Sequence, residues 1–304
     1  MNRRNALQVL AAAAGMSQIP VQAHGAAAGA PKIASRKIPS SGEMLPVIGL
    51  GTWQTFDVGT EAAARAPLEA VLREFATLGG KLIDSSPMYG RSEEVAGDLI
   101  AALGLRQQFF IATKVWISGK AAGIAQMEDS TIKLKANSIE LLQVHNLLDV
   151  EAHLETLTDW KRQGRVRYIG VTHYTNSAFD AVAKVISIHP VDFLQINYSV
   201  GEREAEQKLL PLARERGIAV IVNRPFAGGE LFRRLRSTPV PAWAADIDCT
   251  SWAQLLLKFV ISHPAVTSAI PATSRVEHLR DNMAAGSGRM PDAKMRARIA
   301  ASIA

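Results

Sequence analysis

The chain is poor in cysteine and in aromatic residues. Its 304 residues include a single cysteine, Cys249, and only 6% are Phe, Trp or Tyr. One thiol excludes an intramolecular disulfide and a metal cluster held by several cysteines. His153, His189 and His263 have no histidine four residues away and no neighbouring cysteine, so the sequence does not predict a metal site.

Dense positive charge and long hydrophobic runs are also missing. The formal net charge is +6, but no Lys/Arg stripe with interleaved aromatic residues occurs, so nucleic acid is not an expected partner. The basic runs at 214–217 and 232–236 are short and are interpreted as a solvated helix end and a loop. No stretch supplies the roughly 20 strongly apolar residues of a membrane span, so a stable membrane anchor is not expected.

The N-terminus has the pattern of a twin-arginine export signal. Arg3 and Arg4 precede a weakly apolar, Ala-rich stretch at 6–19, which small residues follow. The pattern predicts cleavage after Ala23, with 26–28 as a second candidate site. We therefore expect the twin-arginine export machinery as a partner and the periplasm as the location. A disordered tail that happens to contain Arg-Arg is the alternative.

The remaining chain is predicted to form one catalytic domain. Residues 1–30 are interpreted as export signal and linker, and 31–304 as the domain, which begins with a hairpin turning at 40–43. From Val47 onward, short apolar runs typical of strands alternate with amphipathic stretches typical of helices. The predicted strands are 47–51, 81–84, 109–114, 139–145, 166–171, 191–198, 218–223 and 267–271. The predicted helices are 61–78, 92–103, 123–135, 150–163, 178–188, 204–216, 252–262 and 276–285.

Eight such units predict a closed α/β barrel, the (β/α)8 or TIM barrel. Parallel strands that are covered on both faces are apolar almost throughout, as these are. An open dinucleotide-binding sheet is disfavoured, because Gly49 and Gly51 are not followed by the third glycine of the G-x-G-x-x-G pattern.

Four polar residues lie at or just past the ends of the second, third and fourth predicted strands: Asp84, Tyr89, Lys114 and His145. Burying isolated charges costs several kcal/mol, by an order-of-magnitude estimate, unless the charges are paired. A shared site therefore explains the four residues with one assumption. The alternative is four unrelated strand-end groups that face solvent.

Together the four residues could form a proton donor directed at a carbonyl group. A tyrosine hydroxyl has a pKa near 10 in model peptides and needs a neighbouring cation to become a better acid. Lys114 can supply that cation, and Asp84 can hold it in its charged form. His145 can donate a hydrogen bond that orients the substrate oxygen.

Seven segments, in order along the chain, resemble motifs of the aldo-keto reductase superfamily. They are IGLGTW at 48–53, Asp-Ser-Ser-Pro-Met-Tyr-Gly at 84–90, ATKVW at 112–116, LLQVHN at 141–146, GRVRYIGVTHY at 164–174, LQINYS at 194–199 and IPATSRVEHLRDNMAA at 270–285. The resemblance implies hydride transfer from NAD(P)H to a carbonyl carbon without a metal. It implies a catalytic tetrad of Asp84, Tyr89, Lys114 and His145, in which Tyr89 is the general acid.

The resemblance also implies the remaining contacts of the site. Thr172, His173 and Gln195 would surround the nicotinamide carboxamide, and Gly51 and Thr52 would border the cofactor. The substrate pocket would be lined by Trp53, Trp116 and Asn146. Two departures concern the nicotinamide. Thr172-His173 replaces the usual Ser-Asn pair, and Asn223 stands where an aromatic ring often stacks, with Phe226 or Arg224 as possible compensation.

A third departure concerns the cofactor phosphate. The usual lysine is Ala272 and a frequent arginine is His278. Thr273, Ser274 and Arg275 can still bind a phosphate at the start of a helix. NADP(H) is therefore the predicted cofactor, and NAD(H) is not excluded. The adenine would contact Asp281 and Asn282.

The leading hypothesis is an exported, NAD(P)H-dependent enzyme that reduces a small-molecule aldehyde or ketone. The first alternative is a cofactor-binding auxiliary subunit with little turnover, motivated by the altered nicotinamide contacts. The second is a lyase or aldolase in which Lys114 forms a Schiff base. The modest loop after the seventh strand and the short tail predict an open pocket, and no single carbonyl substrate is singled out.

Overall fold

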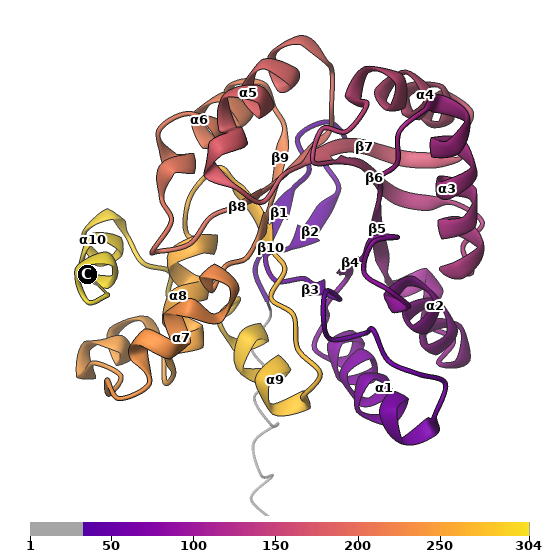
Figure 1. Ribbon diagram of the computed structural model, residues 1–304. Coiled ribbons are helices and arrows are strands. Elements are labelled where there is room, and N and C mark those ends of the chain that lie inside the picture. Colours follow the sequence, from indigo (N-terminus) through magenta and orange to yellow (C-terminus); the bar gives the residue numbers. More distant parts are fainter. Residues whose placement is uncertain (1–32, 304) are drawn as a thin grey trace, which may run out of the picture. The chain divides into compact units, whose positions relative to one another are not determined.

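Eight parallel strands form the centre of the molecule, with helices around them (Figure 1). The structure is a computed structural model that describes residues 33–303. Each strand pairs with the next along the chain, and the first returns to the last through the bridges Ile48–Ala269 and Gly51–Ala272. The predicted (β/α)8 barrel is thereby confirmed. The strands are β3 (Leu50–Gly51), β4 (Leu82–Asp84), β5 (Phe110–Val115), β6 (Ile139–His145), β7 (Val166–Thr172), β8 (Phe193–Asn197), β9 (Ala219–Asn223) and β10 (Val266–Ala269).

The helices lie where the apolar periodicity placed them, with three differences. The predicted helix at 204–216 is the 3-10 turn Glu204–Glu206 followed by α6 (Leu209–Glu215). A proline is tolerated in the first turn of a helix but not in its interior, so Pro211 requires the helix to begin shortly before it. The helices α7 and α10 were not predicted. No helix within residues 33–303 has the length and hydrophobicity to cross a membrane.

The α-helices are α1 (Ala62–Thr77), α2 (Ser92–Ala102), α3 (Lys120–Lys133), α4 (Val150–Arg162), α5 (Phe179–Ile188), α6 (Leu209–Glu215), α7 (Glu230–Leu235), α8 (Trp252–Ile261), α9 (Val276–Ala284) and α10 (Ala293–Ala301). The 3-10 helices are η1 (Arg106–Gln108), η2 (Asn176–Ala178), η3 (Glu204–Glu206), η4 (Ala227–Gly229) and η5 (Ala242–Ile247).

The predicted N-terminal hairpin closes the lower end of the barrel, where the strands begin. Its strands β1 (Ser35–Lys37) and β2 (Met44–Pro46) are antiparallel. The side chains of Ile38 and Leu45 are buried in the interior cluster of the barrel. The Arg36 guanidinium donates hydrogen bonds of 2.5–2.7 Å to three backbone carbonyls between residues 261 and 266. The hairpin therefore seals this end with both apolar contacts and charge-assisted hydrogen bonds.

The barrel interior has an apolar layer and a polar layer above it. Because side chains alternate along a strand, residues two apart on one strand face the same side. In β4 the buried pair is Leu82 and Asp84, and in β5 it is Ala112 and Lys114. The first member of each pair belongs to the interior cluster with the hairpin residues, and the second lies one layer higher. The upper layer is at the C-terminal ends of the strands, where barrel enzymes carry their chemistry.

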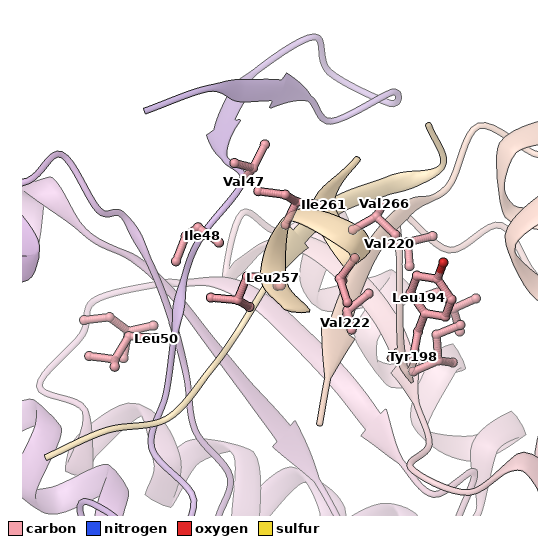
Figure 2. Close-up of a cluster of buried hydrophobic side chains, with 14 of the residues drawn as sticks. Val47, Ile48, Leu50, Leu194, Tyr198, Val220, Val222, Leu257, Ile261 and Val266 are labelled. Carbon is pink, nitrogen blue, oxygen red and sulfur yellow. The ribbon is translucent and has the colours of Figure 1, made fainter. Parts of the chain in front are cut away.

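A second apolar layer lies between the barrel and its helices. Figure 2 shows part of it, where Leu257 and Ile261 of α8 lie in one cluster with Val220, Val222 and Val266 of β9 and β10. The three valines occupy outward positions on their strands, since the alternate residues Ala219 and Ile221 belong to the interior cluster. Both faces of the strands are thus buried, which fixes the strand positions that carry the upper polar layer.

Candidate active site

An ion pair between Lys114 and Asp84 lies at the centre of the upper layer. The Lys114 side chain has 0% exposure, and its Nζ donates to Asp84 Oδ2 at 2.7 Å and to the Ser85 carbonyl at 2.6 Å. Burial lowers the pKa of Lys114, but the charge of Asp84 and the nearby Tyr89 outweigh it, so the pKa is raised. The lysine is therefore a buried ammonium at neutral pH.

Two amide side chains hold the other oxygen of Asp84. Gln195 Nε2 donates to Asp84 Oδ1 at 2.7 Å, and Gln143 Nε2 lies 3.5 Å from the same oxygen. The carboxylate thus has a partner on each oxygen, which is the condition under which a buried charge is tolerated. Gln143 was not predicted as a site residue, although it precedes His145 by two positions on β6 and therefore faces the same side.

Tyr89 lies in the loop after β4, next to the Lys114 ammonium. The Lys114 Nζ is 4.9 Å from the centroid of the phenol ring. Burial raises the pKa of Tyr89, attraction to Lys114 lowers it, and Asp84 raises it again, with a net upward result. The sequence predicted a phenol made more acidic by Lys114. The ammonium does act in that direction, but burial outweighs it.

His145 lies at the end of β6 with its ring against two aromatic side chains. Its ring centroid is 6.3 Å from that of Tyr89, with the planes at 86°, and 6.2 Å from that of Trp116. The Ser86 Oγ is 3.3 Å from His145 Nδ1. Burial, then the charge of Lys114 and then His173, lower the pKa of His145 to about 3. The imidazole is neutral at physiological pH.

The predicted nicotinamide residues gather at the ends of β7, β8 and β9. The Thr172 hydroxyl donates to Gln195 Oε1 at 3.2 Å, and Asn223 Nδ2 donates to the His173 carbonyl at 3.1 Å. The His173 ring accepts the backbone N–H of Tyr174 at 3.0 Å. The buried Asn223 Oδ1 has no hydrogen-bond partner among residues 33–303. A free acceptor therefore lies beside Gln195 and His173.

The segment after β3 is held against β4. The Thr52 hydroxyl is 3.0 Å from both the Asp84 carbonyl and the Ser85 hydroxyl, so it fixes this loop. A Cβ on Gly51 would come within 2.8 Å of the Ile270 carbonyl oxygen, which explains glycine at the barrel closure.

Trp53 and Asn146 complete the predicted pocket residues. The Trp53 side chain is exposed at the rim of the barrel mouth. Asn146 has a left-handed backbone (φ 54°), and its buried Oδ1 makes no hydrogen bond within the described part of the chain. A left-handed non-glycine residue directly after His145 is a strained feature of the kind that clusters at functional sites.

The predicted phosphate residues lie at the start of α9. The Thr273 hydroxyl accepts the Arg275 N–H at 3.1 Å, and Ser274 is exposed. The Arg275 side chain is exposed and donates to Glu277 Oε1 from Nε at 2.7 Å. Arg275 is thus available to a phosphate but already carries its own counter-ion.

The two predicted adenine residues, Asp281 and Asn282, lie on α9 but have different surroundings. Asp281 accepts hydrogen bonds from the Ser251 hydroxyl at 2.8 Å and the Gln254 amide at 2.7 Å, both at the start of α8. Asn282 is buried beside it. The Asp281 carboxylate therefore joins α8 to α9.

Arg224 follows β9 with a left-handed backbone (φ 50°). Its Nη2 is 4.0 Å from Glu202 Oε1, and its buried Nε lacks a hydrogen-bond partner in residues 33–303. The ring of Phe226, the other residue considered for the missing aromatic contact, packs on Phe232 at 4.7 Å between centroids. Within the same residues, no three His, Cys, Asp or Glu side chains are placed to hold a metal ion.

Residues 47–302 match the model of the Aldo/keto reductase family. The chain belongs to this family. It is 31% identical over 257 residues to Methylglyoxal reductase YeaE of Escherichia coli (strain K12), covering 82% of this chain and 88% of that protein. It is 26% identical over 249 residues to Methylglyoxal reductase DkgB of Salmonella typhimurium, covering 79% and 87%.

Solved structures of the family have the same fold. An aldo/keto reductase from Klebsiella pneumoniae in complex with NADP and acetate superposes with a TM-score of 0.73 at 26% identity, covering 90% of this chain and 96% of that chain. An aldo-keto reductase from Klebsiella pneumoniae in complex with NADPH gives a TM-score of 0.73 at 27% identity, covering 90% and 95%. Membership in this oxidoreductase family agrees with the site's position at the C-terminal ends of the strands.

Proposed function

We propose that this aldo/keto reductase uses NAD(P)H to reduce an aldehyde or ketone to an alcohol, with Tyr89 as the general acid. The observation that carries the proposal is the meeting of Tyr89, Lys114, Asp84 and His145 in one layer at the barrel mouth. The ammonium is 4.9 Å from the phenol ring centroid, and the centroid of the imidazole ring is 6.3 Å from it. Family members named as methylglyoxal reductases support a carbonyl substrate.

NADP(H) is the proposed cofactor, and the donor and acceptor groups of the site fit it. When bound, a nicotinamide cofactor supplies a hydride to a carbonyl carbon. The unpaired Asn223 Oδ1, beside Gln195 and His173, suits the N–H₂ of a carboxamide. Thr273, Ser274 and Arg275 at the start of α9 would hold a phosphate. The NADP and NADPH complexes of the Klebsiella pneumoniae relatives support the choice.

Tyr89 would give its proton to the substrate oxygen. Because its pKa is raised above the ordinary value, the phenol is fully protonated at neutral pH and holds the proton that an acid must deliver. As the proton leaves, the adjacent Lys114 ammonium stabilises the phenolate. This stabilisation is the same effect by which Lys114 lowers the pKa of Tyr89, although burial outweighs it in the resting protein.

His145 would orient the same oxygen as a neutral donor. The Ser86 Oγ accepts the Met88 N–H at 3.4 Å, which leaves its own proton for His145 Nδ1. The ring proton is then assigned to Nε2. A neutral imidazole places no positive charge beside Lys114, so it can lie close to the ammonium at no electrostatic cost.

The Schiff-base alternative finds no support in the state of Lys114. A lysine nucleophile must be neutral and must reach the substrate. The Lys114 Nζ is charged, completely buried and bonded to both Asp84 and the Ser85 carbonyl. We therefore assign Lys114 to the stabilisation of charge.

Replacing Tyr89 by Phe tests the proposal. We expect kcat for aldehyde reduction to fall by about 10³-fold, within the range for loss of a general acid, while fluorescence titration with NADPH gives an unchanged Kd. A variant that keeps the parental rate would show that Tyr89 is not the acid. If the parent binds NADPH tightly but reduces none of a broad aldehyde panel, the auxiliary-subunit alternative is favoured instead.

We also propose export through the twin-arginine pathway, with the domain boundary near residue 30. Residues 1–32 lie outside the described residues, so the support is the sequence pattern of Arg3, Arg4 and the Ala-rich stretch. Changing both arginines to lysine should retain the protein in the cytoplasm, as measured by cell fractionation. An unchanged periplasmic fraction, or no periplasmic protein in the parent, would contradict the proposal.

A further inference from the structure

The segment that follows β5 carries two exposed apolar side chains, and the first of them lies beside His145. Trp116 and Ile117 are 40% and 38% exposed, and the indole centroid is 6.2 Å from the imidazole centroid. The strand ends at Val115, so the ladder of β5 supplies no further hydrogen bonds to this backbone. An exposed segment of this kind is rigid only if other groups form hydrogen bonds with its main chain.

Gln126 of α3 binds both backbone groups of Trp116. The Trp116 N–H donates to Gln126 Oε1 at 2.6 Å, and Gln126 Nε2 is 3.4 Å from the Trp116 carbonyl oxygen. An amide side chain has one acceptor and two donors, so it can replace a paired strand residue at this position. The helix thereby fixes the backbone from which the indole projects.

Two further hydrogen bonds hold the rest of the segment. The buried ring of His153 on α4 is bonded through Nε2 to the Ile117 carbonyl at 2.8 Å, and Asp149 Oδ2 accepts the Gly119 N–H at 2.6 Å. A Cβ on Gly123 would come within 2.3 Å of the His153 ring, so this position of α3 must be glycine. The segment 116–119 is therefore held in place even though the side chains of Trp116 and Ile117 are exposed.

We propose that Gln126 is a positioning residue for substrate selection. By holding both backbone groups of Trp116, it keeps the indole beside His145 and so favours carbonyl compounds with a flat, apolar body. This inference rests on the proposed function.

The surroundings of Trp116 favour the same substrate class. Large apolar side chains are exposed in the segments that follow β3, β4, β5 and β7. They are Trp53, Met88, Ile117 and Tyr174. Exposed apolar groups gathered at one end of a molecule mark a binding surface. An aromatic aldehyde can cover part of this surface, whereas a small hydrated carbonyl such as methylglyoxal cannot.

Steady-state kinetics of Gln126→Ala with benzaldehyde and propanal test the proposal. We expect KM for benzaldehyde to rise about fivefold to tenfold with kcat changed less than twofold, and KM for propanal to change less than twofold. Gln126→Glu keeps the acceptor for the Trp116 N–H but loses the donor, so it should show a smaller change. Gln107→Ala, on the exposed 3-10 turn before β5, is the control.

A double-mutant cycle shows whether Gln126 acts through the indole. In a Trp116→Ala background, which keeps the backbone groups of residue 116 but removes the indole, Gln126→Ala should leave the KM ratio of the two aldehydes unchanged. Acrylamide quenching of tryptophan fluorescence should increase in Gln126→Ala and not in the double variant, which is a readout independent of turnover.

Equal effects on both aldehydes, or a full effect of Gln126→Ala without Trp116, would overturn the assignment. A parent enzyme that reduces propanal or other small aldehydes but not benzaldehyde would also overturn the assignment, whereas a parent that reduces no aldehyde of a broad panel would refute the proposed function.

Discussion

The lower and upper halves of the barrel interior differ in chemistry but share the same strands. Below, Phe110, Tyr168 and Phe193 pack with ring centroids 5.5–5.9 Å apart, and the hairpin covers them. Above, the buried residues are a carboxylate, an ammonium and amides that form hydrogen bonds with one another. A step of two residues along a strand separates the layers. Stability and chemistry are therefore assigned to different levels of one set of strands.

The two halves should also respond differently to substitution. A residue of the lower layer can be removed without leaving a charge unpaired, so the loss is confined to packing. A residue of the upper layer cannot be removed alone, because its partner remains as a buried ion or an unpaired donor. The expected results below follow from this difference.

The largest effect is expected for Lys114→Met, which leaves Asp84 as an unpaired buried carboxylate. The free energy of unfolding should fall by about 3–5 kcal/mol, and aldehyde reduction should be lost. In the double variant Lys114→Met with Asp84→Asn, denaturant unfolding should show much of the stability restored while activity remains absent. A double variant as unstable as the single one would contradict the account of the ion pair.

A comparable loss of stability, without loss of chemistry, is expected for Phe193→Ala in the lower layer. Removing this fully buried ring should lower the unfolding free energy by about 3 kcal/mol because it leaves a cavity. At a temperature where the variant is folded, kcat should stay within twofold of the parent. A large fall in kcat with an unchanged melting temperature would show that the two layers are not independent.

Acid should destabilise the protein through His145. Its folded pKa of about 3 lies below the unfolded value near 6.5, so below pH 6.5 the unfolded chain binds a proton that the folded chain does not. Stability due to the neutral ring is present above pH 6.5 and falls as the pH drops toward 3. The loss between pH 7 and 5 should be about 2 kcal/mol smaller in His145→Gln, measured by denaturant titration. Equal losses in both proteins would mean that the ring titrates normally.

The smallest effect is expected at the exposed start of α9. Glu277→Gln removes the counter-ion of Arg275, so the guanidinium should bind the cofactor phosphate more tightly. We expect the Kd for NADPH to fall about threefold by fluorescence quenching, with the Kd for NADH unchanged. Glu74→Gln, which frees Arg280 on the other side of α9, is the matched control. An equal change in the Kd for both dinucleotides would show that Arg275 does not bind the phosphate that distinguishes NADPH from NADH.

The order of strands and helices could be predicted because the signals that encode it are local. Apolar runs ending in Asp84, Lys114 and His145 are short and continuous, and each helix has its own apolar period. α10 was missed although Asp292 caps it through the Met295 N–H at 2.8 Å, because a short polar helix at a chain end has little apolar period. Its attachment through the half-buried Arg296 to Ser262 and the Tyr198 hydroxyl is a long-range contact.

The four residues proposed for catalysis followed from the sequence alone, because strand-end positions in a parallel barrel must share one face. Their protonation states did not follow. The raised pKa of Tyr89 and the neutral state of His145 depend on burial, which the whole barrel produces. The contacts of Gln126 with Trp116 likewise depend on how α3 lies against β5. The sequence by itself thus determined which residues reach the site and at what spacing. The dielectric environment of these residues and the partners of their side chains were decided only by packing between distant segments.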